Sequence, residues 1–324
     1  MIVEDFIYGN YDVREKVLLD VMESRPLQRL KGIAQAGASK YVLPHRCSNR
    51  YEHSVGVMLL LRHLGATVEE QLAGLMHDIP HTAFSHVVDY VFENEEQDFH
   101  EHFHERIVMG SEIPSLLKAH GISVDYVLDE SNFPLLERKI PDLCADRVDY
   151  ALRDGASGLG YVERSRTLFN GLAVHDNEIV FTGGSGALDF ARYFLQSDYE
   201  MWASPAEVGI FHIMAKAIKR GLDESVISED DLFLDDSGLY SKLKNSGSAE
   251  VERWLGLLTP NLNIVEADDG CDFRSSAKVR YVDPKFIEGG EILRASEAYP
   301  RLKEEIRRHN EKISRGFCLK IKRE

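Results

Sequence analysis

The stretch YEHSVGVMLLLRHLGATVEEQLAGLMHDIPHTAFSHVVDYVF, residues 51–92, decides the fold class. Its apolar residues recur at the three- and four-residue spacing of a helix in the runs 51–64, 68–78 and 84–92. Upstream, residues 15–35 show the same spacing. We therefore predict that the first half of the chain is almost entirely helical and that the protein is mainly α.

Histidines are concentrated in this half of the chain. A neutral imidazole is the commonest metal ligand in proteins and a frequent proton carrier, so a cluster of them predicts a metal site. Nine of the 13 histidines lie between residues 45 and 104, namely His45, His53, His63, His77, His81, His86, His100, His102 and His104.

The chain contains two His-Asp dipeptides. His77-Asp78 follows an apolar helical run, whereas His175-Asp176 falls at the expected tip of a β-hairpin over residues 172–182. Asp-Asn is ordinary turn chemistry at such a tip, so we interpret the second dipeptide as structural. Only the first is a candidate for metal binding.

Four strings give the first dipeptide a context. They are QRLKGIAQAGASKYVLP (28–44), NRYEHSVGV (49–57), HDIPHTAFSH (77–86) and ADRVDYALRD (145–154). In this order and spacing they resemble the HD-domain superfamily of metal-dependent phosphohydrolases, in particular its branch of deoxynucleoside triphosphate triphosphohydrolases. The resemblance covers about residues 15–160 and implies an HD-domain helical bundle that hydrolyses a phosphate ester of a nucleotide.

The resemblance implies that one divalent metal is bound by His53, His77, Asp78 and Asp146. Neighbouring residues on a helix point about 100° apart, so an ion held by both members of a dipeptide must sit beside a helix end and take ligands from other helices. Mixed imidazole and carboxylate ligands suit Mn, Fe, Zn, Co or Ni, and a nucleotide substrate brings the option of an additional Mg.

Further residues are expected around the metal and the substrate. The positions implied to relay protons or orient ligands are His81, His86, Asp89, His100 and Glu101, with His86 as the general acid. Those implied to contact the substrate are Gln35, Arg50, Arg147, Tyr150 and Asp154, although Asp154 could equally serve in a salt bridge. We expect His102 and His104 on the surface, and Asp146, Tyr150 and Arg153 on one helix face that points at the metal.

One segment departs from the branch. Where the triphosphohydrolases carry basic residues that hold the triphosphate, FLQSDYEMWASPAEV (194–208) has none. A monophosphate needs fewer cations than a triphosphate, so an alternative function is a phosphomonoesterase acting on a nucleoside monophosphate or another small phosphorylated metabolite. A second alternative is a catalytically silent protein that senses nucleotides.

The second half of the chain mixes helices and strands. We expect helices over residues 100–109, 113–120, 141–153, 188–201, 205–221, 239–244, 250–258 and 296–315, strands over 277–282 and 317–322, and surface loops over 229–236 and 266–272. The predicted division is an HD phosphohydrolase domain over residues 1–222, including the hairpin, and a small C-terminal α+β appendage over 223–324.

Composition excludes several classes of protein. The 324 residues carry a net charge of −16, which argues against a strong nucleic-acid surface. The apolar runs are too short to cross a membrane and MIVEDFIYGN does not resemble a signal peptide, so we expect a cytoplasmic protein. Four widely spaced cysteines, Cys47, Cys144, Cys271 and Cys318, indicate reduced thiols rather than disulfides. A homo-oligomer is expected from the resemblance alone.

Overall fold

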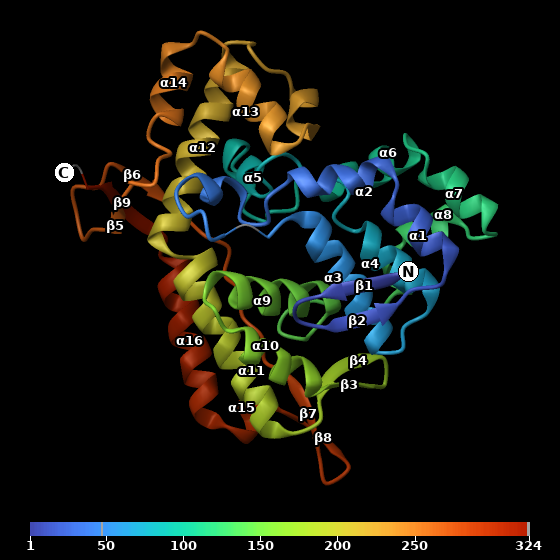
Figure 1. Cartoon of the computed structure of the whole chain (residues 1–324). Helices are drawn as coiled ribbons and strands as arrows, with labels where there is room; N and C mark the ends of the chain where they lie inside the picture. Colours follow the sequence, from blue (N-terminus) through green and yellow to red (C-terminus); the bar gives the residue numbers. More distant parts are fainter. Residues whose placement is uncertain (47, 323–324) are drawn as a thin grey trace.

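The computed structural model describes residues 1–46 and 48–322, and most of them are helical (Figure 1). The mainly α prediction is confirmed. In the first half the helices are α1 Lys16–Met22, α2 Arg25–Arg29, α3 Arg50–His63, α4 Val68–Met76, α5 Val87–Val91, α6 His104–Met109, α7 Ile113–Ala119, α8 Val124–Leu128, α9 Ala145–Gly158 and α10 Val162–Asn170. In the second half they are α11 Gly184–Ser197, α12 Pro205–Asp223, α13 Asp236–Lys244, α14 Ala249–Leu255, α15 Ala295–Ala298 and α16 Pro300–Ser314.

Helix α3 forms the centre of the first half and begins with a capping box. The Glu52 backbone N–H donates to the Asn49 side chain at 2.9 Å, and the Asn49 N–H donates to the Glu52 carboxylate at 3.3 Å. Residues 53–61 of α3 are all buried, and the helix packs against α4 and α9. This packing brings the starts of α3 and α9 to the end of α4.

Two helices predicted as continuous are interrupted. The run 15–35 divides into α1 and α2 because Ser24 is extended, as expected near Pro26, whose ring is compatible only with a helix start. The run 84–92 becomes helical only at Val87, because Phe84 and Ser85 have positive φ angles of 62° and 52°. The Phe84 N–H donates to the Asp236 carboxylate at 2.6 Å, which holds this turn in place.

Asp236 corrects another expectation. The segment 229–236 was predicted as a surface loop, but it forms a 3₁₀ turn over Glu229–Phe233 and leads into α13 with a fully buried Asp236. Its carboxylate also accepts from the Ala34 N–H at 3.0 Å and pairs with Lys40 at 2.7 Å. The α13 region therefore supports the two loops that lead into the histidine-rich segments.

The strands form three small sheets. The predicted hairpin is confirmed as β3 and β4, which join β7 and β8, while β9 lies between β5 and β6. The β1–β2 hairpin at the start of the chain was not predicted. The bounds are β1 Ile2–Asp5, β2 Gly9–Asp12, β3 Leu172–His175, β4 Glu178–Phe181, β5 Ile264–Glu266, β6 Phe273–Ser275, β7 Lys285–Glu288, β8 Glu291–Arg294 and β9 Phe317–Ile321.

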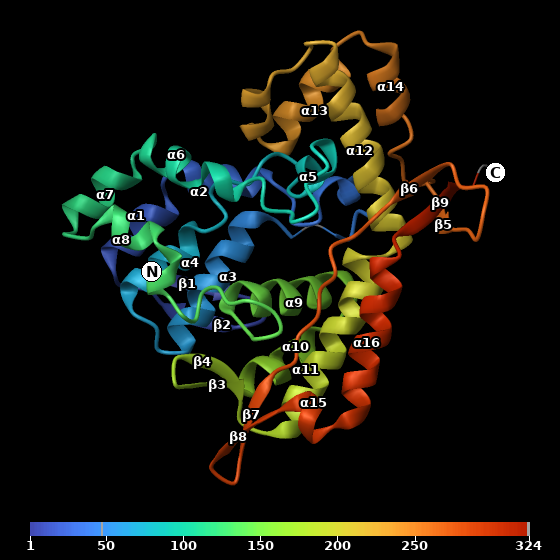
Figure 2. The ribbon, with the colours of Figure 1, turned by 180° about the vertical axis from the view of Figure 1, so that it is seen from behind.

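The strand predicted over residues 277–282 is absent from the described structure. Residues 276–284 instead form the unpaired connection from β6 to β7 (Figure 2). This connection passes between two hydrophobic clusters, with Val282 buried in one and Val279 packed against the other. Both clusters contain residues from either side of position 222, so the domain division at that position stays a prediction.

The expectation of reduced thiols is wrong for one pair. Cys271 and Cys318 form a disulfide that links the β5–β6 connection to β9, and a spacing of 47 residues gives no local signal for such a pair. Cys144 is a buried free thiol, and Cys47 lies outside the described residues.

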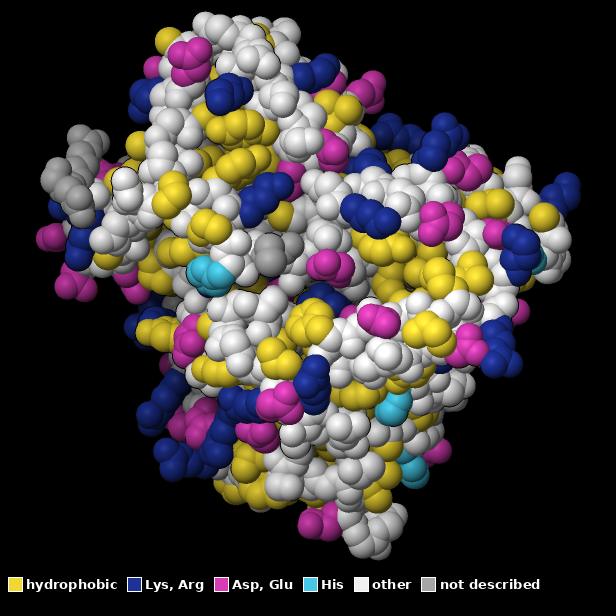
Figure 3. Space-filling model, in the orientation of Figure 1, with side chains coloured by type: hydrophobic (Ala, Val, Ile, Leu, Met, Phe, Trp, Pro, Cys, Tyr) yellow, Lys and Arg dark blue, Asp and Glu magenta, His cyan; other side chains and the backbone are white. Residues whose placement is uncertain are grey.

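The distribution of surface charge and the apolar character of the helices indicate which surroundings the protein suits. On the face shown in Figure 3, the side chains of Lys and Arg are interspersed with those of Asp and Glu. Among the described helices, none combines the length and the apolar character that a membrane crossing requires. The cytoplasmic location stays a prediction.

Candidate metal centre

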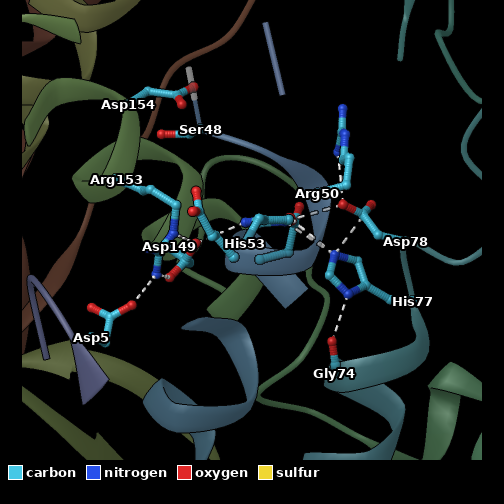
Figure 4. Close-up of polar contacts among 12 residues, drawn as sticks. Asp5, Ser48, Arg50, His53, Gly74, His77, Asp78, Asp149, Arg153 and Asp154 are labelled. Atoms are coloured by element: carbon cyan, nitrogen blue, oxygen red, sulfur yellow. Dashed lines mark hydrogen bonds and ion pairs between the residues drawn. The ribbon is translucent and has the colours of Figure 1, made fainter. Parts of the chain in front are cut away.

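The four predicted ligands come from three places that the fold brings together. His53 lies in the first turn of α3, Asp146 in the first turn of α9, and His77 caps the end of α4 immediately before Asp78. Figure 4 shows His53, His77 and Asp78 turned toward one another. The dipeptide thus sits at a helix end, where its two side chains can reach one point despite their different directions.

Three acceptor atoms converge at this point. His53 Nε2 lies 3.2 Å from His77 Nε2 and 2.9 Å from Asp146 Oδ1. The Nδ1–H of His53 donates to Asp149 at 2.8 Å and that of His77 to the Gly74 carbonyl at 2.7 Å, so in the neutral form of each ring Nε2 carries the lone pair. Three lone-pair donors this close can share one cation, and their chemistry fits a divalent transition metal.

Asp78 lies at the edge of this set. Its carboxylate oxygens are 3.6 Å from His53 Nε2 and 3.4 Å from His77 Nε2. The Arg50 guanidinium donates to the same carboxylate at 2.9 Å, and His81 Nε2 lies 3.2 Å away. Asp78 therefore lies between the two candidate histidine ligands on one side and Arg50 and His81 on the other.

The potential of the centre favours a positive charge. Burial alone would lower the pKa of His53, but the carboxylates of Asp78, Asp146 and Asp149 raise it to about 10. The pKa of His77 is raised in the same direction, against burial, by Asp78 and Asp146. The carboxylates thus favour a positive charge at this place in spite of its burial.

Sequence reasoning missed the residue that orients His53. Asp149, fully buried, receives hydrogen bonds from the Tyr8 hydroxyl at 2.7 Å and from Arg153 at 2.9 Å. Arg153 also pairs with Asp5 at 2.9 Å, so it lies behind Asp149 (Figure 4) and, contrary to the prediction, does not point at the metal position. The available signal was the spacing of Asp149, three residues after Asp146 and four before Arg153.

A group of histidines borders the convergent ligands. His81 and His100 stack with ring centres 3.7 Å apart, and burial lowers the pKa of both, so both are neutral near pH 7. His86 lies edge-on to them and its Nδ1 is 3.0 Å from Asp89. Burial also lowers the pKa of His86, while Asp89 opposes this shift, so the side chain can accept a proton before it donates one.

An acidic cavity of about 550 Å³ opens beside His77. Glu101 lines it, and burial, with help from Glu130 and Asp98, raises the pKa of Glu101. His104 also lines this cavity and donates to the Met76 carbonyl at 3.1 Å, which corrects the prediction of a surface position, while His102 is exposed as predicted. The carboxylates of the cavity belong to Glu101, Glu105, Asp125, Asp129 and Glu130.

A second cavity, of about 20 Å³, is lined by Gln35 and by Asp154 of α9. The Gln35 amide oxygen is buried without a hydrogen-bond partner among the described residues. Asp154 accepts from the Trp202 indole N–H at 2.8 Å, and burial raises its pKa. Tyr150 lies one turn earlier on α9 and contacts the Trp202 ring edge-on at 5.0 Å.

The arginines implied to bind substrate already have protein partners. Arg50 donates to Ser85 at 3.0 Å in addition to Asp78. Arg147 donates to the Asp142 carbonyl at 3.0 Å and pairs with Glu137 at 3.2 Å. Both guanidiniums therefore have part of their charge compensated by groups of the protein.

The segment 194–208 carries carboxylates instead of cations. It includes the end of α11, a π-helical turn over Asp198–Trp202 and the start of α12. Within it, Asp198 is buried and pairs with His309 at 2.7 Å, and Glu207 pairs with Arg46 at 2.7 Å. The predicted cap of α12 is confirmed, since the Ser204 hydroxyl accepts from the Glu207 N–H at 3.2 Å.

This helical fold, with imidazole and carboxylate ligands converging from three helices and neutral histidines beside them, defines a class of helical metal-dependent hydrolase. The family model described as HD domain matches residues 50–151, which contain all four predicted ligands. The chain belongs to the HD-domain family of metal-dependent phosphohydrolases, and it is an enzyme that hydrolyses phosphate esters.

Relatives along the whole chain support this assignment. The chain is 36% identical to YdhJ of Bacillus subtilis, over 99% of each protein. It is 32% identical to the metal-dependent phosphohydrolase cns2 of Cordyceps militaris, over 90% of this chain and 86% of that protein. A shorter match joins 27% of this chain to 16% of the human deoxynucleoside triphosphate triphosphohydrolase SAMHD1, at 34% identity.

A solved structure shares the fold. The phosphohydrolase BT4208 from Bacteroides thetaiotaomicron superposes with a TM-score of 0.71, covering 92% of this chain and 94% of that one. The two sequences are 19% identical, so this likeness concerns the fold.

Proposed function

We propose that the protein hydrolyses a phosphate ester of a nucleotide, with deoxynucleoside triphosphates as one candidate class, and that His53, His77, Asp78 and Asp146 hold the metal. The observation that carries the proposal is the convergence of His53, His77 and Asp146 in a chain that belongs to the metal-dependent phosphohydrolases. A metal centre suits a phosphate, and the unpaired Gln35 oxygen with the Asp154 carboxyl suits a sugar hydroxyl. The triphosphate class is supported by the match to SAMHD1.

Each of the predicted site residues has a defined part in the proposal. A divalent metal among Mn, Fe, Zn, Co and Ni supplies activation of a water molecule and neutralisation of phosphoryl charge when bound. His86, oriented by Asp89, transfers the proton to or from the leaving oxygen, with His81 and His100 as neutral neighbours and Glu101 at the cavity rim. The substrate contacts are Gln35, Arg50, Arg147, Tyr150 and Asp154.

The second candidate is a phosphomonoesterase. It is favoured by the segment 194–208, in which Asp198 contacts His309, Glu207 pairs with Arg46, and no lysine or arginine is present to hold a phosphate chain. A substrate with one phosphate places the smallest demand on such a site.

The experiment is product analysis with metal-reconstituted protein. A panel of deoxynucleoside mono-, di- and triphosphates is incubated with the wild type and with Asp146→Asn as the blank, and released anions are identified by phosphorus NMR. Tripolyphosphate supports triphosphohydrolysis, and orthophosphate from monophosphates alone supports the phosphomonoesterase. No release with any of the five metals contradicts both and favours the nucleotide-sensing alternative.

A further inference from the structure

The substrate of this enzyme is an anion, but the surroundings of the metal centre are largely negative. The arginines nearest the centre are paired with carboxylates: Arg50 with Asp78 at 2.9 Å and Arg147 with Glu137 at 3.2 Å. The 550 Å³ cavity beside His77 adds further carboxylates. Phosphate groups beyond the metal therefore need cations from elsewhere in the chain.

The connection between β6 and β7 is a candidate source. We call its residues 276–283 the strap. At one end, the Ser276 carbonyl accepts from the Tyr90 hydroxyl at 2.9 Å, and at the other the Asp283 N–H donates to the Pro141 carbonyl at 3.0 Å. Tyr90 lies on α5 directly after Asp89, and Pro141 precedes α9. The strap therefore bridges the element that carries His86 to the element that carries Asp146 (Figure 2).

The strap presents two cations on one side. In an extended chain, residues two apart point to the same side, so Lys278 and Arg280 point together while Ala277 and Val279 pack against the second hydrophobic cluster. Lys278 donates to the Glu96 carbonyl, and Arg280 donates to the Gln97 side-chain oxygen. Both acceptors belong to the loop that follows α5, so the cations lie on the His86 side of the centre.

These two cations differ from the other basic residues of the site because their partners are neutral. Among the described residues, neither has a carboxylate within ion-pair distance, whereas Arg46, Arg50 and Arg147 each have one. The Arg280 charge adds to burial in lowering the pKa of His86, and it opposes the rise that burial gives the pKa of Tyr150. Arg280 therefore acts on residues from both walls of the site.

We propose that Lys278 and Arg280 bind the phosphate groups of the substrate that lie beyond the metal centre. They would replace the basic residues that segment 194–208 lacks. A guanidinium can hold phosphate oxygens in a bidentate manner and an ammonium adds a point charge, so the pair suits a di- or triphosphate chain. The inference rests on the proposed function in that it places a nucleotide phosphate at the metal.

Calorimetry with inorganic anions tests the strap without requiring turnover. Orthophosphate, pyrophosphate and tripolyphosphate are titrated into the manganese-loaded full chain. Three proteins are compared: the wild type, the double variant Lys278→Met/Arg280→Gln, and the control Arg274→Gln, which changes an exposed arginine on β6. We expect the double variant to weaken tripolyphosphate binding about 30-fold or more, since two charge-assisted contacts are lost. Orthophosphate binding should change less than threefold, and the control should match the wild type.

Two further readouts separate binding from support of the fold. Arg280→Lys keeps the charge and should retain most of the tripolyphosphate affinity that the double variant loses. The Tm of each variant reports whether the substitution loosens the strap. Equal weakening of all three anions, or unchanged tripolyphosphate binding, overturns the proposal. If no nucleotide is hydrolysed, the proposed function fails, while the calorimetric comparison still decides the role of the strap.

Discussion

The two His-Asp dipeptides of this chain have opposite surroundings. His77-Asp78 lies at the end of α4 among buried side chains, with acceptor atoms of three elements around it. His175-Asp176 lies at the turn of the β3–β4 hairpin, where Asp176 and Asn177 have positive φ angles of 49° and 59° and the Asp176 side chain is 92% exposed. The same two residues can therefore form part of a metal centre only where other elements add candidate ligands and exclude water.

The largest expected effect comes from replacing the aspartate of the first dipeptide, Asp78. Asp78→Asn removes a negative charge beside His53 and His77 and leaves the buried Arg50 without its counter-ion. We expect metal-dependent hydrolysis to fall at least about 1,000-fold, equivalent to about 4 kcal/mol of barrier. Steady-state rates and metal content by mass spectrometry measure this.

The matched control is Asp176→Asn, which makes the same chemical change at the exposed turn. Its rate and metal content should stay within about twofold of the wild type, because a surface substitution there alters no buried partner. A similar loss in both variants would contradict the contrast between the dipeptides.

A smaller effect is expected from the residues that orient His53. Asp149→Asn replaces the carboxylate that accepts from His53 Nδ1–H, so the ring loses its fixed tautomer. We expect metal affinity to fall about 10- to 100-fold, and Tyr8→Phe, which removes one hydrogen bond to Asp149, to have a milder effect in the same direction. Competition with a fluorescent chelator measures both affinities.

Glu163→Gln is the control for this series, since it neutralises an exposed carboxylate on α10 whose partner is Arg166. Unchanged metal affinity in Asp149→Asn would show that His53 does not depend on this carboxylate.

The smallest expected effect concerns pH and the two kinds of histidine environment. Burial, aided by His77, lowers the pKa of His104 to about 4, against an ordinary value of 6.5. A histidine with a lowered folded pKa contributes its full stability above pH 6.5 and loses it as the pH falls toward 4. For this partly exposed group we expect a loss of about 1 kcal/mol at pH 5.

Urea unfolding at pH 7.5 and pH 5 measures that loss. His104→Gln keeps a donor for the Met76 carbonyl and should lose less stability on acidification than the wild type. His175→Gln at the exposed turn should behave like the wild type, and equal acid sensitivity of all three proteins would argue against a role for His104.

The sequence indicated the candidate centre because the residues proposed as its ligands follow local rules. His53, His77 and Asp146 lie at the starts or ends of helices that apolar spacing reveals, and the strings around them resemble one family. The roles of individual residues at the site stay predictions. The contribution of Tyr8 was not predictable in this way, because its bond to Asp149 spans 141 residues and follows no pattern within either segment.

The strap illustrates a second limit. Alternation in residues 277–282 indicated a strand, but no neighbouring strand pairs with it in the described structure, and its ends are fixed by Tyr90 and Pro141 instead. Local periodicity indicates an extended backbone but does not show which strand, if any, pairs with it. The Cys271–Cys318 pair was missed for a related reason, since β9 brings the two residues together only in the folded sheet.

The bond between Tyr8 and Asp149 also bears on the order in which the protein matures. Residues 1–12 leave the ribosome before α9 does, but Tyr8 and Asp5 find their partners only after α9 has been synthesised and packed. Contacts of such long sequence separation form slowly because a large loop must close first. We therefore expect a nascent chain to bind metal weakly until the β1–β2 segment docks against α9, so acquisition of the metal becomes a late event of biosynthesis.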